Sequence, residues 1–226
     1  MIRKTMKTYV NRDQLNRFTP QIIQRGSYAS PEISVYLTNG NKWAVKDCSG
    51  MQPFLKLIIG RRYKNREIFI YKRLEGVEGI PSFKGIIDQD AFAVEFIEGE
   101  TLSRKLAPEL LNKALDNLEK VINTIHERGV VHLDLKQKRN VLVKASGEVV
   151  VIDFQSSLFF SQSPLGRLMI SLLKGRDKAG LVKFKAKYAH DLLTTQEKKI
   201  YKRDLILSRL WPFSHLGRFV RQIFKN

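Results

Sequence analysis

Cysteine is nearly missing from this sequence: Cys48 is the only one among 226 residues, which excludes a disulfide framework within the chain. No Cys or His residues have the spacing of a zinc site. Runs of about eighteen uncharged apolar residues are also missing, and the basic N-terminal residues precede no apolar region, so we expect neither a membrane span nor an export signal. These absences favour a reducing compartment, and we expect a cytoplasmic protein.

Acidic residues are scarce as well, since 22 Asp and Glu residues face 40 Lys and Arg residues, for a net charge of +18. From Pro164 onward there are fifteen basic residues and four acidic ones. Such an excess suits an anionic partner, either nucleic acid or an acidic membrane surface, although solvated helix faces carry similar charges. The hydrophobic content of 43% supplies a core for one large domain or for two small lobes.

The first part of the chain has the pattern of an antiparallel sheet. Alternating residues predict strands at 20–24, 32–37 and 42–46, with a hairpin turn at Asn39-Gly40. Alternation places Lys46 on the same face as the small Ala44, which leaves room beside the lysine. Lys46 is therefore either an edge lysine in solvent or part of a ligand site.

A helix predicted over residues 61–74 favours the ligand site. Its apolar residues recur at helical spacing, and Glu67 lies on the border of the apolar face. We expect Glu67 to pair with Lys46, with Glu75 at the helix end as the alternative. Such a pair would extend the lysine toward the phosphates of a nucleotide.

The rest of the chain predicts further elements and a division into two lobes. Strands are predicted at 81–88 and 91–97, a helix at 108–128, and a hairpin formed by 140–143 and 148–152. Residues 98–102 break the pattern and predict a hinge between an N-lobe, residues 1–98, and a C-lobe, residues 99–226.

The basic tail is predicted to be mostly helical. Apolar positions recur at Leu165, Leu168, Met169, Leu172 and Leu173. Residues 216–225 predict a short basic amphipathic helix after Pro212. That helix either packs on the C-lobe or contacts an anionic membrane surface, such as the inner face of the cell membrane.

The segment from His132 to Asn140 contains the side chains that point to chemistry. Asp134 lies in it, and Asp153 follows the β-branched run of residues 149–152. In phosphoryl transfer, one carboxylate accepts or orients the proton of the attacking hydroxyl, while an Asn and a second carboxylate hold magnesium. Asp134 suits the first role, and Asn140 and Asp153 suit the second, because magnesium prefers a few hard oxygens on rigid supports.

The order of these pieces resembles the protein-kinase-like superfamily over about residues 20 to 160. The matching pieces are Lys46 on a strand, Glu67 on a helix, residues 94–97 before a hinge, His132, Asp134, Asn140, and Asp153 followed by Phe154. The resemblance implies an α+β fold with a small antiparallel-sheet N-lobe and a mostly helical C-lobe. It also implies ATP and Mg²⁺ between the lobes.

The resemblance assigns roles to residues. It makes Lys46 the phosphate-binding lysine with Glu67 as its partner, Asp134 the catalytic aspartate, and Asn140 and Asp153 the magnesium ligands. It further implies that Lys136 contacts the γ-phosphate, that Gly26, Glu95 and Ile97 contribute to the nucleotide site, and that His132 positions the loop rather than acting as a base.

The departures from the family pattern are informative. A short Gly26–Ser30 segment replaces the glycine-rich loop, Leu133 stands where the family has Arg, and five residues rather than four separate Asp134 from Asn140. Gln155 follows Asp153 and Phe154 in place of glycine, and the segment that binds peptide substrates is missing.

These losses make the chain similar to small bacterial kinases of lipopolysaccharide-core sugars (Kdo or heptose) and to RIO kinases. Gln155 favours the RIO pattern, whereas the cations of the loop and tail suit an anionic sugar phosphate. The acceptor is thus a sugar hydroxyl or a protein Ser/Thr hydroxyl.

A different class of function stays open, namely a catalytically silent kinase-like scaffold that binds an anionic partner. The retained carboxylates argue against it, because buried carboxylates are costly unless paired or metal-bound. The tail's aromatic residues share an apolar helix face instead of alternating with cations, which disfavours nucleic-acid binding. Nothing in the sequence indicates an oligomeric state.

Overall fold

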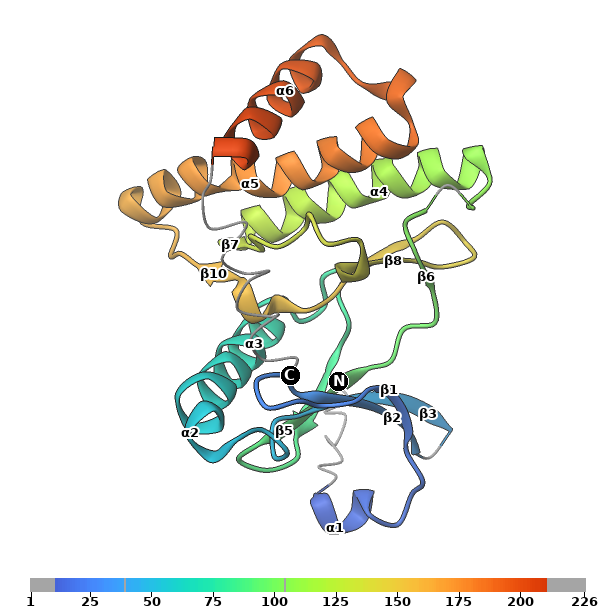
Figure 1. The fold of residues 1–226 in the computed structure, drawn as a ribbon, viewed down its shortest axis with the longest axis vertical. Helices are drawn as coiled ribbons and strands as arrows, with labels where there is room; N and C mark the ends of the chain where they lie inside the picture. The colour runs from blue at the N-terminus through green and yellow to red at the C-terminus, as the bar shows by residue number, and fades with distance from the viewer. Residues whose placement is uncertain (1–10, 39, 104, 211–226) are drawn as a thin grey trace, which may run out of the picture.

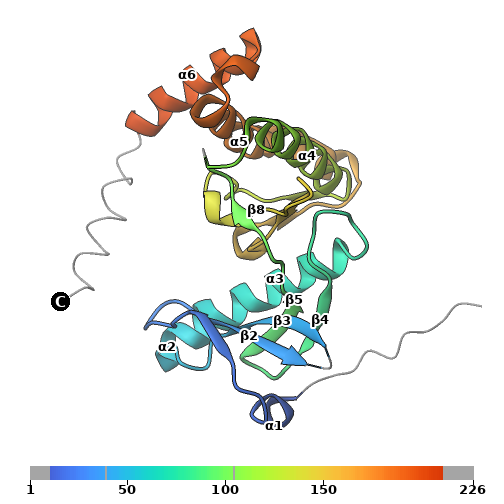
Figure 2. The ribbon, with the colours of Figure 1, turned by 90° about the vertical axis from the view of Figure 1, so that its right-hand side faces the viewer.

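The computed structural model describes residues 11–38, 40–103 and 105–210. The fold is α+β, with an antiparallel sheet at the N-terminal side and helices after it, as predicted. Figure 1 and Figure 2 show two lobes, one built around the sheet and the other mostly helical. In the described residues, no helix is both long and apolar enough to cross a membrane.

The N-lobe sheet has five strands in the order β1-β2-β3-β5-β4, with every neighbouring pair antiparallel. The hairpin predicted at residues 39 and 40 joins β2 to β3, where Thr38 pairs with Asn41. The strands are β1 (Gln21–Gln24), β2 (Glu32–Thr38), β3 (Asn41–Asp47), β4 (Phe83–Ile86) and β5 (Ala91–Glu95).

One side of this sheet is closed by a short helix that the sequence pattern did not predict, α1 (Arg12–Leu15). Leu15 packs with Val45 in a small apolar cluster. The Arg12 guanidinium donates to the carboxylates of Asp47 and Asp88, which ties the helix to the ends of the strands. Val45 is buried and Lys46 is half-buried, and the two lie on opposite faces of the sheet because consecutive strand residues alternate.

The helix predicted over residues 61–74 is α3 (Arg61–Arg73), and its apolar face is buried at Ile68, Tyr71 and Leu74, as predicted. Its helical backbone begins earlier than the sequence indicated, with α2 (Pro53–Leu55) followed by a π-helical turn, η1 (Lys56–Gly60). Pro53 suits the first helical position because it needs no backbone donor there.

The C-lobe is built on three helices, α4 (Pro108–Glu127), α5 (Pro164–Tyr188) and α6 (Thr195–Leu210). The predicted helix over 108–128 is confirmed, and Leu115, Leu118 and Ile125 are fully buried in the main core. The shorter elements are β6 (Glu100–Thr101), β7 (Val130–Val131), η2 (Lys138–Asn140), β8 (Val141–Val143), β9 (Val149–Val151), η3 (Phe154–Ser156), β10 (Leu158–Phe159) and η4 (His190–Leu192).

The chain crosses between the lobes after β5, and β6 then pairs with β8 of the C-lobe. Residues 98–102, the predicted hinge, fall in this connection, and the division into 1–98 and 99–226 at this point stays a prediction. The hairpin predicted from 140–143 to 148–152 is formed by β8 and β9.

As far as residue 210 the tail is mostly helical, as predicted, but its apolar positions differ in environment. In α5, Leu165, Leu168 and Leu172 are exposed, whereas the second half of the helix is buried against α4 and α6. A helical period identifies a common face but does not say whether anything covers it. The amphipathic helix predicted at 216–225 lies outside the described residues.

Candidate active site

Lys46 and two carboxylates form the centre of the site. The Lys46 ammonium, on β3, donates to Glu67 Oε2 at 2.7 Å and to Asp153 Oδ1 at 2.9 Å. Glu67 comes from α3 of the N-lobe and Asp153 from the C-lobe, just after β9. Glu67, only 2% exposed, is therefore the partner of Lys46, while Glu75 is exposed beyond the end of α3.

The pKa values of these groups follow from burial and mutual charge. Burial alone would lower the pKa of Lys46, but the charges of Glu67 and Asp153 outweigh it and raise that pKa above its ordinary value. Burial alone would raise the pKa of Asp153, but the Lys46 charge and hydrogen bond lower it below the usual range. Lys46 is thus held as an ammonium beside an ionised Asp153.

Asp153 adopts a left-handed backbone conformation, with φ 67° and ψ 67°, and this turn sends the next side chain into the core. The Phe154 ring is fully buried and packs edge-on against Tyr71 of α3, with 5.2 Å between ring centroids. It also lies 4.9 Å from the His132 ring. Phe154 therefore anchors Asp153 between α3 and the loop of residues 132–140, which the resemblance makes the catalytic loop.

The catalytic loop is held by His132, which is buried. Its Nδ1 accepts from the Asp134 backbone N–H at 3.3 Å, so the ring proton lies on Nε2 and is donated to Ile152 O at 3.1 Å. Burial lowers the pKa of His132, which favours this neutral form. The geometry agrees with a positioning role, as the resemblance implied.

Asn140 is buried beside Asp134. Its Nδ2 donates to the Asp134 backbone O and to Asp134 Oδ2, both at 3.1 Å. The residues just before Asn140 form the 3-10 turn of η2. Lys136, the predicted γ-phosphate contact, lies in the same loop, and its backbone O accepts from the ammonium of Lys183 at 3.1 Å.

A further residue supports the loop, and sequence reasoning missed it. Asp177 of α5 is fully buried, and its carboxylate accepts from the backbone N–H of His132 at 2.8 Å and of Leu133 at 2.7 Å. It also lies 2.9 Å from Nε2 of His126. Leu133 has a positive φ of 68°, a conformation that these bonds hold in place. No local motif surrounds Asp177, and only burial of an isolated acidic residue on a helix could have indicated it.

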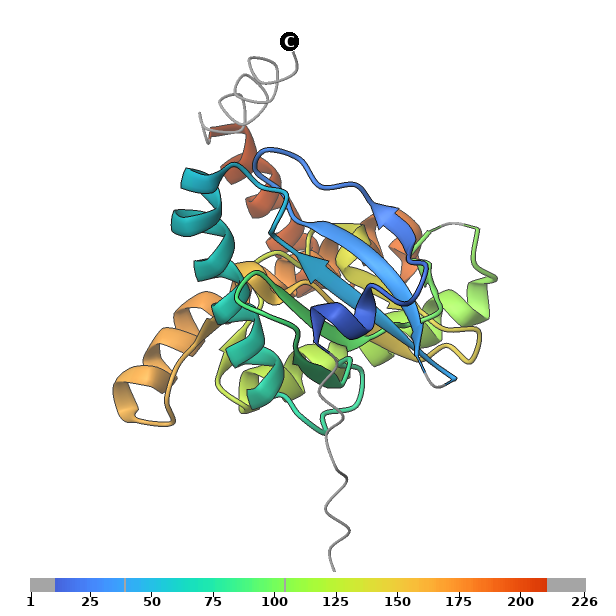
Figure 3. The ribbon, with the colours of Figure 1, turned by 90° about the horizontal axis from the view of Figure 1, so that it is seen from below.

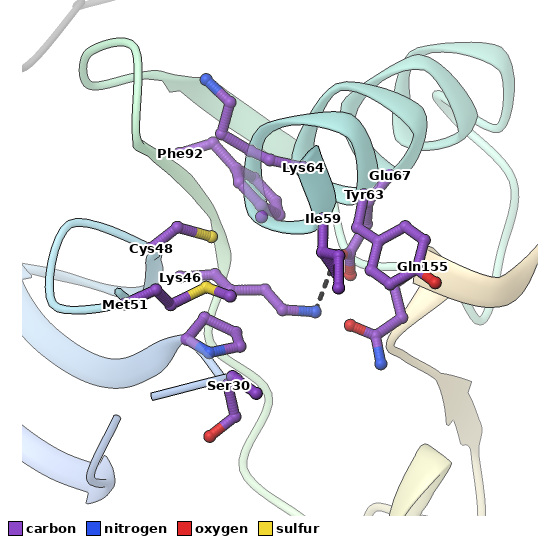
Figure 4. A pocket seen from close by; sticks show the side chains of 13 residues that line it. Ser30, Lys46, Cys48, Met51, Ile59, Tyr63, Lys64, Glu67, Phe92 and Gln155 are labelled. Atoms are coloured by element: carbon purple, nitrogen blue, oxygen red, sulfur yellow. Dashed lines mark hydrogen bonds and ion pairs between the residues drawn. The ribbon is translucent and has the colours of Figure 1, made fainter. Parts of the chain in front are cut away.

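A cavity of about 110 Å³ lies beside Lys46 (Figure 4). Its walls come from the Ala29–Pro31 turn, from β3 and from the start of α3, and they include Lys46, Glu67 and Gln155. Gln155, which stands where the family has glycine, brings a C-lobe side chain to this wall. The cavity therefore adjoins the Lys46–Glu67 pair.

The other predicted nucleotide contacts, Gly26, Glu95 and Ile97, are not among the residues that line this cavity. The Glu95 side chain accepts from the backbone N–H and the hydroxyl of Ser82, so any contact of Glu95 with a nucleotide would use its backbone. Gly26 is closely approached, because a Cβ added there would lie 3.2 Å from the backbone N of Glu32.

The predicted magnesium ligands lie at the same end of one hairpin. Asn140 precedes β8 and Asp153 follows β9, and the Ile152 N–H donates to Asn140 O at 3.0 Å. Within the described ranges, no three His, Cys, Asp or Glu side chains gather as a metal cluster. A magnesium–nucleotide site needs no such cluster, since one or two carboxylates suffice when phosphates and waters complete the octahedron. The side-chain oxygens of Asp153 and Asn140 are suitable ligands for such a magnesium ion.

A sequence model of the protein kinase domain matches residues 19–172, more than half of the chain. The chain belongs to the protein kinase domain family. A search of curated proteins found no match. The matched range contains the whole sheet, α3, the catalytic loop and Asp153.

Membership of the protein kinase domain family supports a phosphotransferase function, and domains of this family generally bind ATP and Mg²⁺. The match ends at residue 172, before Asp177. Asp177, which supports the catalytic loop, therefore lies five residues past the matched range, in α5.

Proposed function

We propose that this protein kinase domain transfers the γ-phosphoryl group of ATP to a hydroxyl of its acceptor. The observation that carries the proposal is the Lys46 ammonium, which is bonded at once to Glu67 and to Asp153, with Asp134 and Asn140 bonded to each other in the adjoining loop. This set contains a phosphate-binding cation, two oxygen ligands for a metal and a carboxylate for the hydroxyl proton.

Each side chain has a role in the proposed transfer. Lys46 binds the α- and β-phosphates, and Glu67 holds it extended. Asp153 and Asn140 would hold magnesium, which neutralises the phosphate charge when bound. Asp134 takes the proton of the acceptor hydroxyl as that oxygen bonds to the γ-phosphorus and the bond to the leaving ADP oxygen breaks.

The charge of the loop favours an anionic acceptor. Lys138 and Arg139 are exposed and lie within five residues of Asp134. Arg139 is close enough to Asp153 to contribute to its lowered pKa, after the larger effects of burial and of Lys46. A phosphorylated sugar of the lipopolysaccharide core would be attracted by these cations, whereas a Ser/Thr side chain in a basic peptide would be repelled.

The test is transfer of labelled γ-phosphate from ATP to phosphorylated core sugars, to acidic proteins and to basic proteins. We expect labelling of the anionic acceptors, and Asp134→Ala should lower turnover by about two to four orders of magnitude, because a positioned proton acceptor is lost. Asp116→Ala, which removes an exposed carboxylate from α4, is the matched control and should keep wild-type turnover.

Two results would contradict the proposal. Equal turnover in Asp134→Ala and wild type would remove the role of that carboxylate. Transfer to none of the acceptors, together with no hydrolysis of ATP, would favour a catalytically silent scaffold.

A further inference from the structure

The first half of α5 has an exposed apolar stripe. Leu165, Leu168 and Leu172 are 69%, 54% and 66% exposed. Their spacing of three and four residues places them on one helix face. Figure 1 and Figure 3 show that this half of α5 extends beyond the rest of the C-lobe. The three residues, named here the leucine face, therefore form a ridge at the edge of the molecule.

Local contacts fix this half of the helix in place. The Ser163 hydroxyl accepts from the Gly166 N–H at the helix start. Just before it, the Gln162 amide donates to Glu127 O at 3.0 Å, and the Phe160 N–H donates to Gly129 O at 2.8 Å. The helix is capped and tied to the end of α4. Its position is therefore fixed, with the leucine face on the outside of the molecule.

Cations lie on the same helix as the leucine face, mostly on its opposite side. No acidic residue occurs between Asp153 and Asp177, and Asp177 is fully buried. α5 exposes four basic residues near the leucines: Arg167, Lys174 and Arg176 in its first half, and Lys178 just after Asp177. Leucines on one face of a helix with neighbouring Lys and Arg are typical of helices that lie in a membrane interface.

We propose that the leucine face docks on the surface of an anionic lipid bilayer. Charge complementarity favours lipid headgroups, since each nearby cation is attracted to an anionic surface. The shape also favours a bilayer over a peptide, because a peptide helix fills a groove, whereas the leucine face is a ridge on one projecting helix. The leucine face consists of other residues than the basic helix predicted at residues 216–225.

Docking at the leucine face would orient the kinase site. α5 continues from Leu172 to Asp177, which holds the catalytic loop, over about 7 Å of helix rise. A bilayer that binds the leucines thus sets the position of Asp134 relative to the membrane. Docking itself does not depend on the proposed phosphoryl transfer, although an acceptor carried by the membrane would benefit from it.

The test is sedimentation of the whole chain with vesicles of phosphatidylcholine, or of equal parts phosphatidylcholine and phosphatidylglycerol. Wild type should bind the anionic vesicles and not the neutral ones. The triple change Leu165→Ser, Leu168→Ser and Leu172→Ser should weaken binding about tenfold, since apolar area that would enter the interface is lost. The matched control changes the exposed Phe54, Leu57 and Ile58 to Ser and should bind within about twofold of wild type.

The role of charge needs its own pair of variants. Changing Lys174, Arg176 and Lys178 to Gln should weaken binding to anionic vesicles more than changing the exposed Lys198, Lys199 and Lys202 of α6 to Gln. Both variants lose the same net charge. Equal losses would show that total charge, and not the cations of the helix that carries the leucine face, drives binding, and would overturn the proposal.

Two other outcomes would also overturn it. The leucine variant could bind anionic vesicles as tightly as wild type. Alternatively, light scattering could show that wild type is a dimer and the leucine variant a monomer with unchanged vesicle binding, in which case a second copy covers this face. The vesicle results stand apart from phosphoryl transfer, because none of the substituted residues contacts the Lys46, Asp134 or Asp153 site.

Discussion

At the scale of residues, one ammonium neutralises carboxylates from both lobes. Lys46 bonds to Glu67 of α3 and to Asp153 after β9, and Glu67 is almost completely buried. A buried charge is tolerated only while its partner is present. The pair therefore has a structural effect that can be separated from nucleotide binding.

Replacing Lys46 by Met should destabilise the fold by about 3 to 5 kcal/mol, because Glu67 keeps a buried charge without its partner. The double variant Lys46→Met with Glu67→Leu should recover much of that loss, since the remaining carboxylate, Asp153, is more exposed than Glu67. Urea unfolding measures both. Lys42→Met is the control and should leave the free energy of unfolding close to that of wild type, because Lys42 forms only an exposed pair with Glu98.

If the double variant were as unstable as the single one, packing of the lysine stem rather than charge would explain the loss. A single variant as stable as wild type would contradict the geometry of the pair.

The burial of His132 should make the stability of the fold depend on pH. Because its folded pKa is lowered by burial, the unfolded chain binds a proton that the folded chain does not, once the pH falls below about 6.5. The contribution of neutral His132 to the unfolding free energy is complete above that pH and decreases as the pH falls toward the lowered folded pKa. The lowered pKa of Asp153 acts in the same direction at lower pH.

His132→Gln should therefore flatten the fall in unfolding free energy between about pH 6.5 and pH 5, by up to about 1.4 kcal/mol per pH unit. Denaturant unfolding at a series of pH values measures this slope. His190→Gln, which changes an exposed histidine, should leave the slope of the wild type. An unchanged slope in His132→Gln would contradict a buried neutral imidazole.

At the scale of elements, α5 connects a surface to the catalytic loop. Its first half carries the leucine face. Farther along, the Asp177 carboxylate accepts hydrogen bonds from the backbone N–H groups of His132 and Leu133. The loop conformation, with its positive φ at Leu133, therefore depends on a helix that begins 31 residues after Leu133, at Pro164.

Asp177→Asn should lower turnover strongly while changing MgATP affinity little, because the amide presents N–H groups to the donors of the loop. Leaving a buried donor unsatisfied should also cost about 1 to 3 kcal/mol of stability. Turnover and nucleotide affinity measured together separate the two effects. Asp191→Asn, at an exposed site after α5, is the control. If Asp177→Asn lost only nucleotide affinity, the positioning role of Asp177 would be contradicted.

Elements with strong local signals were predictable. Turn residues and alternation identified the β2–β3 hairpin, and the helical period and flanking Pro and Gly identified α4. The pairing of Lys46 with Glu67 followed because both lie on regular elements. Asp177 was not predictable, because its partners lie 45 and 44 residues away and no local pattern indicates burial. The exposure of Leu165 was missed for the same reason.

At the scale of the whole molecule, the site is assembled from both lobes. The N-lobe supplies Lys46 and Glu67, and the C-lobe supplies Asp134, Asn140 and Asp153. The ion pair of Lys46 with Asp153 connects the two lobes directly. A ligand that binds this set binds only the folded, assembled molecule, so its affinity should appear as a gain in stability.

Thermal melting of the whole chain with ATP, with and without magnesium, tests this account most directly. At about 100 times the dissociation constant, MgATP should raise the melting temperature of wild type by about 5 to 10 °C. Asp134→Ala should keep the shift, because its carboxylate acts on the acceptor. Asp153→Ala should lose it, each variant being compared with its own ligand-free form. No shift in wild type, or an equal shift in Asp153→Ala, would contradict the proposed magnesium–nucleotide site.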